Sequence, residues 1–249
     1  MEFDEKAMLF DKSYTCPVCE QPFTSKTVRT GKVHMLYSDY DLRPVYDTVD
    51  QVKYEVIACP HCGYAALIRY YEPSMSVKRV EMIRNAVCSR YKTIDWGKDL
   101  YTYDEAKLRY RLALANAIAR GAKLSEKAYL YLKNAWLIAG ETDALKKQDP
   151  PDEAKIAANN KAEKEMRGLA LDGFLQARAN ENFPIAGMDE KTLDYLLAAL
   201  CLNQEKYSEC TRFLSNILMS KNITSNLLKR TQGLKEKLEE ATGKKVEEE

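Results

Sequence analysis

The chain has 249 residues, of which 45% are hydrophobic and 30% are charged, and this composition indicates a folded protein rather than a disordered one. No stretch approaches the roughly 18 consecutive apolar residues of a membrane span, and the acidic N-terminus lacks the apolar run of a secretory signal. We therefore expect a cytoplasmic protein with no membrane partner, in a compartment where paired cysteines indicate a metal before a disulfide.

The net charge of +1 is distributed unevenly along the chain. Residues 75–135 contain 13 Lys and Arg against 6 Asp and Glu, whereas residues 1–74 contain 8 against 11. Only the block 75–135 is therefore basic, and clustered cations are what contact with phosphate requires.

Two CPxC pairs near the N-terminus form the most specific motif of the sequence. Their cysteines are Cys16, Cys19, Cys59 and Cys62. Two residues between thiols let a tight turn present both sulfurs to one ion, and two such turns complete the closed four-thiolate cage of a structural zinc site. Gly63 supplies the permissive backbone that such a turn, or knuckle, often needs, while Glu20 occupies the equivalent position of the first pair. We predict that the four cysteines bind one structural zinc ion.

Other interpretations of these cysteines are a thioredoxin-like redox pair, an iron–sulfur cluster and reduced structural thiols. Two matched pairs argue against a single redox motif, and the usual spacings of iron–sulfur ligands differ. His61 lies between two ligands, where its ring does not easily reach the same ion. His34 is interpreted as a strand residue that would become a ligand only if one cysteine were unbound.

The segment between the two knuckles has the pattern of β-structure. Residues 24–38 are rich in β-branched side chains and contain a bulge or a bend at Gly31. Residues 38–51 form a turn-rich loop, and residues 52–59 form a strand that delivers Cys59. Strands that connect two knuckles make a zinc ribbon. Such a small module has little core, so we expect metal binding to contribute folding free energy directly, on the order of 10 kcal/mol.

From Pro73 onward, helical periodicity replaces the strand pattern. Thr102 and Glu105 have the spacing of a capping box that begins a helix, and Gly121 marks its end. The apolar stripe predicted for this helix consists of Leu108, Leu112, Ala115 and Ala119.

A second helix is predicted to begin at a cap on Ser125 and to stop at Gly140. A third follows the Asp149-Pro150-Pro151 segment.

The helices near the C-terminus give the clearest periodicity. Residues 189–204 and 207–220 each carry a wide apolar face, and their short connection predicts an antiparallel hairpin that resembles one tetratricopeptide unit. Residues 225–242 form a last helix that could cap the array. Three further cysteines, which lack a partner thiol nearby in the sequence, are interpreted as small buried hydrophobic groups: Cys88, Cys201 and Cys210.

These patterns predict an α+β protein in two parts. A small β zinc ribbon occupies residues 1–74, an all-α, tetratricopeptide-like antiparallel helical array occupies residues 75–243, and residues 244–249 form a charged, flexible tail.

The segments CPVCEQPFTSKTVRTGKVH, SDYDLRPVYD, KYEVIACPHCGYAA and DYLLAALCLNQEKYSECTRFLSNIL resemble a bacterial family of unknown function that is common in Firmicutes. The resemblance covers nearly the whole chain, and the double CPxC motif with GYAA is its most specific part. It implies a zinc ribbon joined to a tetratricopeptide-like helical region, and no established activity. Relatives carry a glycine- and arginine-rich segment in the late helix where this chain has Ala199 and Leu202-Asn203-Gln204.

We expect a non-enzymatic scaffold whose helical groove binds a protein or peptide partner. The sequence lacks a phosphate-cradling glycine loop, a dinucleotide fingerprint and a nucleophile elbow, and its only histidines lie in the ribbon. The sequence does not specify the partner or the oligomeric state.

The first alternative is nucleic-acid binding through the ribbon and the basic block, and a remote one is a thiol-based redox sensor that releases zinc on oxidation. The candidate cations of the ribbon are Lys26, Arg29 and Lys32, with His34, and those of the basic block include Lys78, Arg79, Arg84, Arg109 and Arg111.

Overall fold

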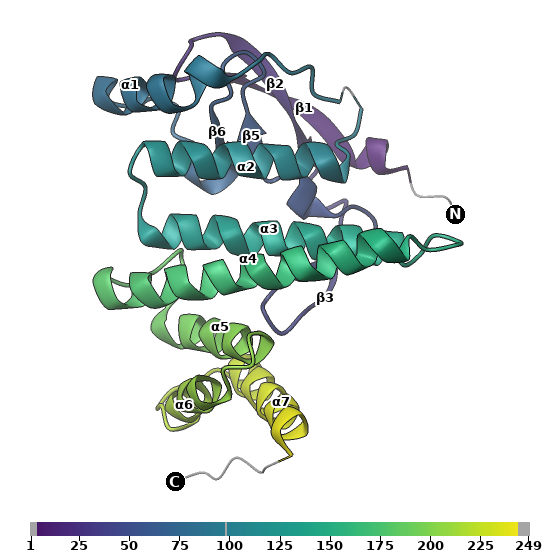
Figure 1. Ribbon diagram of the computed structural model, residues 1–249, viewed down its shortest axis with the longest axis vertical. Helices are drawn as coiled ribbons and strands as arrows, with labels where there is room; N and C mark the ends of the chain where they lie inside the picture. Colours follow the sequence, from purple (N-terminus) through teal and green to yellow (C-terminus); the bar gives the residue numbers. More distant parts are fainter. Residues whose placement is uncertain (1–3, 98, 244–249) are drawn as a thin grey trace.

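The computed structural model describes residues 4–97 and 99–243 of the chain (Figure 1). Its N-terminal part contains three antiparallel two-stranded sheets, and helices form the remainder. The strands are β1 (Leu9–Thr15), β2 (Pro22–Val28), β3 (Met35–Ser38), β4 (Pro44–Tyr46), β5 (Val56–Ala58) and β6 (Ala65–Leu67). The predicted α+β class is thereby confirmed. The division at residue 74 stays a prediction, and the tail 244–249 lies outside the described residues.

The helices stack in successive layers (Figure 1). They are α1 (Val77–Ala86), α2 (Tyr103–Ala119), α3 (Leu124–Leu145), α4 (Glu153–Asn180), α5 (Glu190–Asn203), α6 (Tyr207–Leu218) and α7 (Ser225–Thr242). The β1–β2 and β5–β6 sheets lie with α1 and α2 at one end of the molecule, and α5–α7 form the other end. Helices α3 and α4 form the middle, and β3 lies beside them. Within the described part of the chain, no helix combines the length and the apolar character needed to cross a membrane.

Two of the three hairpins place the knuckles at their turns. Strands β1 and β2 pair from Leu9↔Val28 to Thr15↔Pro22, so that residues 16–21 form the turn between them. Strands β5 and β6 pair in the same way around residues 59–64. The sequence predicted strands only between the knuckles, yet β1 and β6 lie outside that segment. Each pair of cysteines therefore belongs to a hairpin turn.

The segment between these hairpins also differs in detail from the prediction. Residues 44–46 of the expected loop form β4, which pairs with β3. The expected strand at residues 52–59 is shorter, because residues 51–54 form a 3-10 helix that Asp50 caps through its bond from the Val52 N–H (3.1 Å). Strand β5 nevertheless delivers Cys59, as predicted. Gly31 has a φ of +80°, which agrees with the predicted bend.

The observed ends of α2 agree with the ends predicted from the sequence, whereas the observed ends of α3 do not. Thr102 and Glu105 form the reciprocal capping box, and Gly121 follows α2 with a φ of +65°. The predicted cap at Ser125 and stop at Gly140 are wrong, since α3 runs from Leu124 to Leu145. Gly140 lies inside α3 and lets the side chain of Asp50 approach the helix closely. A Cβ at Gly140 would lie 2.2 Å from the carboxylate of Asp50.

The buried face of α2 is also displaced from the predicted apolar stripe. Its buried residues are Ala106, Arg109, Tyr110, Ala113, Asn116 and Ala117. Of the predicted stripe, Leu108, Leu112 and Ala119 are only half-buried and Ala115 is exposed. The reason is that α2 packs between the β5–β6 hairpin and α3, and the ribbon side of this contact is polar.

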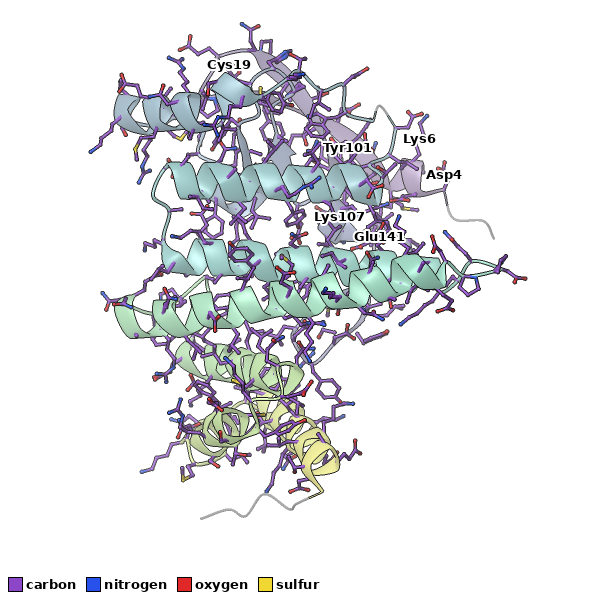
Figure 2. All side chains as sticks on the ribbon, viewed as in Figure 1. Asp4, Lys6, Cys19, Tyr101, Lys107 and Glu141 are labelled. Carbon is purple, nitrogen blue, oxygen red and sulfur yellow. The ribbon has the colours of Figure 1, made fainter. Side chains whose placement is uncertain are left out.

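Buried ionic contacts tie the helical layers together. The Glu141 carboxylate of α3 accepts bonds from Lys107 of α2 (2.8 Å) and from Lys155 (2.9 Å) and Asn159 (3.1 Å) of α4. Figure 2 labels Lys107 and Glu141 where α2 and α3 face each other. One carboxylate thus connects three helices.

Candidate metal centre

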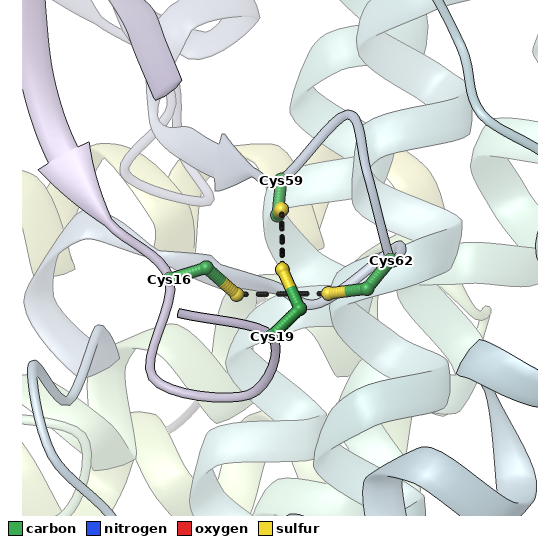
Figure 3. A group of neighbouring side chains, drawn as sticks. All are labelled: Cys16, Cys19, Cys59 and Cys62. Carbon is green, nitrogen blue, oxygen red and sulfur yellow. Dashed lines mark hydrogen bonds between the residues drawn. The ribbon is translucent and has the colours of Figure 1, made fainter. Parts of the chain in front are cut away.

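The four predicted ligands converge at one point of the ribbon. The sulfurs of Cys16 and Cys62 are 3.6 Å apart, those of Cys19 and Cys59 are 3.7 Å apart, and all four lie within 4.8 Å of one another. Figure 3 shows the two short separations crossing between the knuckles. The two hairpin turns therefore contribute to a single centre that could hold a metal ion.

The spacing of the sulfurs fits one tetrahedral ion. With metal–sulfur bonds of about 2.3 Å, tetrahedral geometry places neighbouring sulfurs about 3.8 Å apart. The observed separations of 3.6 and 3.7 Å are close to this value. Four donors around one ion leave no coordination position for a water or a substrate, which is the arrangement of a structural site.

The two knuckles have the same backbone geometry. In the first, the Glu20 N–H donates to the Cys16 carbonyl (2.9 Å), and in the second the Gly63 N–H donates to the Cys59 carbonyl (3.1 Å). Glu20 has a φ of +62° and Gly63 one of +76°. Both knuckles thus need a left-handed residue after the second cysteine, and the first one places a non-glycine residue there at a cost of about 1–2 kcal/mol.

A ring from outside the ribbon encloses the second knuckle. A Cβ on Gly63 would lie 2.4 Å from Cδ2 of Tyr91, so glycine is needed here for contact as well as for backbone conformation. The Asn116 side chain of α2 donates to the Gly63 carbonyl (2.9 Å). The sequence motif alone gave no indication of either neighbour, because both come from distant segments.

Protonation of the four cysteines opposes metal binding. Hydrogen bonding to Cys59 raises the pKa of Cys16 to about 12, and hydrogen bonding to Cys16 raises the pKa of Cys62 well above its ordinary value. Metal binding must expel these protons, so metal affinity is expected to fall as the pH falls.

Cys88 is a fifth thiol beside the centre, which corrects its interpretation as a small buried hydrophobic group without a nearby partner thiol. It is half-buried and packs against the hydrophobic cluster that contains Cys16, Cys59 and Cys62. A hydrogen bond with Cys62 lowers the pKa of Cys88 to about 7. Cys88 is nevertheless outside the group of four mutually close sulfurs. Cys201 and Cys210, by contrast, are fully buried as predicted.

Neither histidine lies in the group of four sulfurs. His61 is exposed, and its Nε2 lies 3.4 Å from the Pro22 carbonyl oxygen. His34 is exposed next to β3, with its Nδ1 3.3 Å from Asp47. Both positions agree with the interpretation of these residues as non-ligands.

The side chain of Arg109 on α2 connects this helix to the ribbon through hydrogen bonds. Its side chain is fully buried, and its Nη2 donates to the Val56 carbonyl (2.6 Å) and to the Ser25 hydroxyl (2.7 Å). The guanidinium also lies 4.1 Å from the ring centre of Tyr101 and 5.1 Å from that of Trp96. Burial lowers the pKa of Arg109, and aromatic faces rather than a carboxylate surround its charge.

The other cations of the basic block are divided between internal contacts and solvent. Arg79 pairs with Glu72 (3.1 Å), and Arg84 donates to the Val18 carbonyl of the first knuckle (2.6 Å). Lys78 and Arg111 are exposed. Arg109 is unavailable to a phosphate backbone, so the block presents fewer cations than its composition indicated.

Comparison with curated proteins gives no match, and neither does comparison with solved structures. A family model described as an uncharacterized protein conserved in bacteria (DUF2225) matches residues 9–239. The match includes both knuckles and helices α1–α7, apart from the last residues of α7. The chain therefore belongs to this bacterial family.

Proposed function

We propose that the protein is a non-enzymatic interaction scaffold whose ribbon is held together by one structural zinc ion. The observation that carries the proposal is the mutual approach of four cysteine sulfurs to within 4.8 Å, which supplies a complete tetrahedral donor set. Zinc is favoured because four thiolates on two short turns are its usual structural ligands. The proposal places the protein in the cytoplasm, where these thiols stay reduced.

The helical array supports the scaffold role. Helices α5 and α6 form an antiparallel hairpin with Tyr207 near the turn and the smaller Cys210 three residues later, as in a tetratricopeptide-like unit. Stacked hairpins of this kind present extended surfaces to peptides and proteins. A closed metal site and two exposed histidines supply no evident catalytic group.

Two measurements test this function. Elemental analysis of the purified chain should give one zinc per chain, and the Cys59→Ser variant should have lost it. Affinity purification from the native organism, with and without nuclease, should return a protein partner in both conditions. Recovery that depends on nucleic acid would favour the nucleic-acid alternative, and a chain that carries iron instead would refute the zinc assignment.

A further inference from the structure

Helix α1 packs against the candidate metal centre rather than on the main core of the protein. Its buried residue is Ile83, which belongs to a small hydrophobic cluster that also contains Cys16, Cys59 and Cys62. Among the described residues, no member of α1 belongs to the larger core cluster, to which helices α2–α7 all contribute. The packing of α1 therefore depends on the part of the ribbon that the four cysteines shape.

Apolar residues on both sides of Ile83 extend this contact. Met75 precedes α1, Val80 lies within it and Cys88 follows it, and all three are half-buried against the same cluster. Val80 and Ile83 are three residues apart and so share one face of the helix. Met82 is 39% exposed, beside Ile83 in the sequence but outside this contact. One face of α1 thus covers the metal centre.

Polar contacts from the same segment reach the backbone of both knuckles. The Arg84 guanidinium donates to the Val18 carbonyl of the first knuckle (2.6 Å). In the second knuckle, the Pro60 carbonyl accepts a bond from the Ile94 N–H (3.3 Å), and the ring of Tyr91 lies against the turn. These contacts require both turns to keep their shape, and a shared ion would hold that shape.

Helix α1 is too short to be stable without this contact. It has 10 residues, and isolated helices shorter than about 12–15 residues are only marginally stable in water. Its N-cap residue, Ser76, makes no side-chain capping bond, and its first turn contains no acidic residue. Lys78 and Arg79 instead place positive charge at the positive end of the helix dipole. The helical state of this segment therefore depends on its docking to the knuckles.

We propose that metal binding by the four cysteines docks helix α1, and that metal removal releases residues 75–94 from the knuckles. This inference rests on the proposed metal centre and extends the metal-dependent unit beyond the predicted division at residue 74. The coupling is reciprocal, because any docking that metal favours must in turn favour metal binding. In the metal-free chain, the side chains of Ile83 and Arg84 become accessible, so metal content controls which surface this end of the protein presents.

Hydrogen exchange followed by mass spectrometry tests the proposal on the full-length chain. Exchange is compared in the zinc-loaded protein and after removal of zinc with a chelator under reducing conditions. We expect the amides of residues 81–87 to exchange at least about tenfold faster without zinc. Helices α5 and α6 should keep their protection, because they are buried in the larger core cluster.

Variants of α1 test the coupling from the other side. In Ile83→Ala, zinc affinity measured by competition with a chromophoric chelator should weaken by about tenfold or more. The matched control Met82→Ala should bind zinc like the parent, and since both changes favour the helix intrinsically, helix propensity does not explain a difference. Arg84→Met removes the bond to Val18 and leaves the apolar cluster intact, so it should weaken zinc binding in the same direction. Circular dichroism establishes that each variant is folded.

Three results would overturn the inference. Equal exchange of α1 with and without zinc would refute the docking, and equal zinc affinity of Ile83→Ala and the parent would refute the coupling. Loss of protection in α5 and α6 together with α1 would show that the metal sustains the whole fold rather than a unit that ends near residue 94. A chain that binds no zinc in elemental analysis would refute the proposed metal centre and the docking with it, whereas a zinc-loaded chain with an unresponsive α1 would refute the docking alone.

Discussion

Replacing the buried Gly63 with alanine should strongly destabilise the ribbon. The left-handed φ of +76° imposes a strain of about 1–2 kcal/mol on any residue with a Cβ. The new methyl group would also lie 2.4 Å from Cδ2 of Tyr91, and overpacking of this kind costs about 1–3 kcal/mol. Together the two effects predict a loss of about 2–5 kcal/mol in the free energy of unfolding.

The assay is urea denaturation of the zinc-loaded protein, followed by circular dichroism. The matched control is Glu20→Ala, because Glu20 has a φ of +62° and already bears the strain of a Cβ, so that its change should stay within about 0.5 kcal/mol. The double variant Gly63→Ala/Tyr91→Ala should recover the part of the loss that arises from the ring. Equal stability of Gly63→Ala and Glu20→Ala would refute this account of the knuckle.

Three further predictions follow from the contacts of the site and the helices. Cys16→Ser should lose the metal, whereas Cys88→Ser should keep it, as measured by elemental analysis. Arg109→Lys should lower the free energy of unfolding, measured by urea denaturation, by about 2 kcal/mol or more, because an ammonium cannot reproduce the hydrogen bonds and ring contacts of the guanidinium. An unchanged midpoint of urea denaturation would contradict this. Burial alone would raise the pKa of Glu141, but bonds from Lys107 and other neighbours lower it below 4.5. Its stabilising contribution is therefore present above pH 4.5 and lost as the pH falls through the lowered pKa, so the parent's advantage over Glu141→Gln should disappear in acid.

The metal centre was predictable because its information is local. Each CPxC pair specifies its own turn, and two matched pairs predict that both turns contribute to one site. The capping box at Thr102 was predictable for the same reason, since both partners lie within four residues. Ser125 and Gly140 carried equally clear local signals that tertiary contacts overrode. The Ser125 N–H donates to Glu181 (3.0 Å), and Gly140 lies against Asp50.

The groups that surround the centre were not predictable from the sequence. Cys88 follows Cys62 by 26 residues, with no motif that relates the two. Arg109 has the ordinary appearance of a solvated helix charge, and only the packing of α2 onto β5 shows that it is buried. Helical periodicity predicts that the apolar residues of a helix are the buried ones. This prediction is wrong where a helix packs against another part of the protein through polar side chains, as α2 does against the β5–β6 hairpin.

The candidate metal centre and the β3–β4 hairpin are connected through the chain itself. The knuckles fix the two ends of residues 20–58, and this segment contains the β3–β4 hairpin. The middle of the segment is fixed separately, because Asp41 binds α3 and α4 while Ser38 binds α7. An ion that constrains both ends therefore restricts how far the hairpin can move relative to the helices. An ion bound by the four cysteines would therefore stabilise the position of the hairpin without any chemistry at the metal.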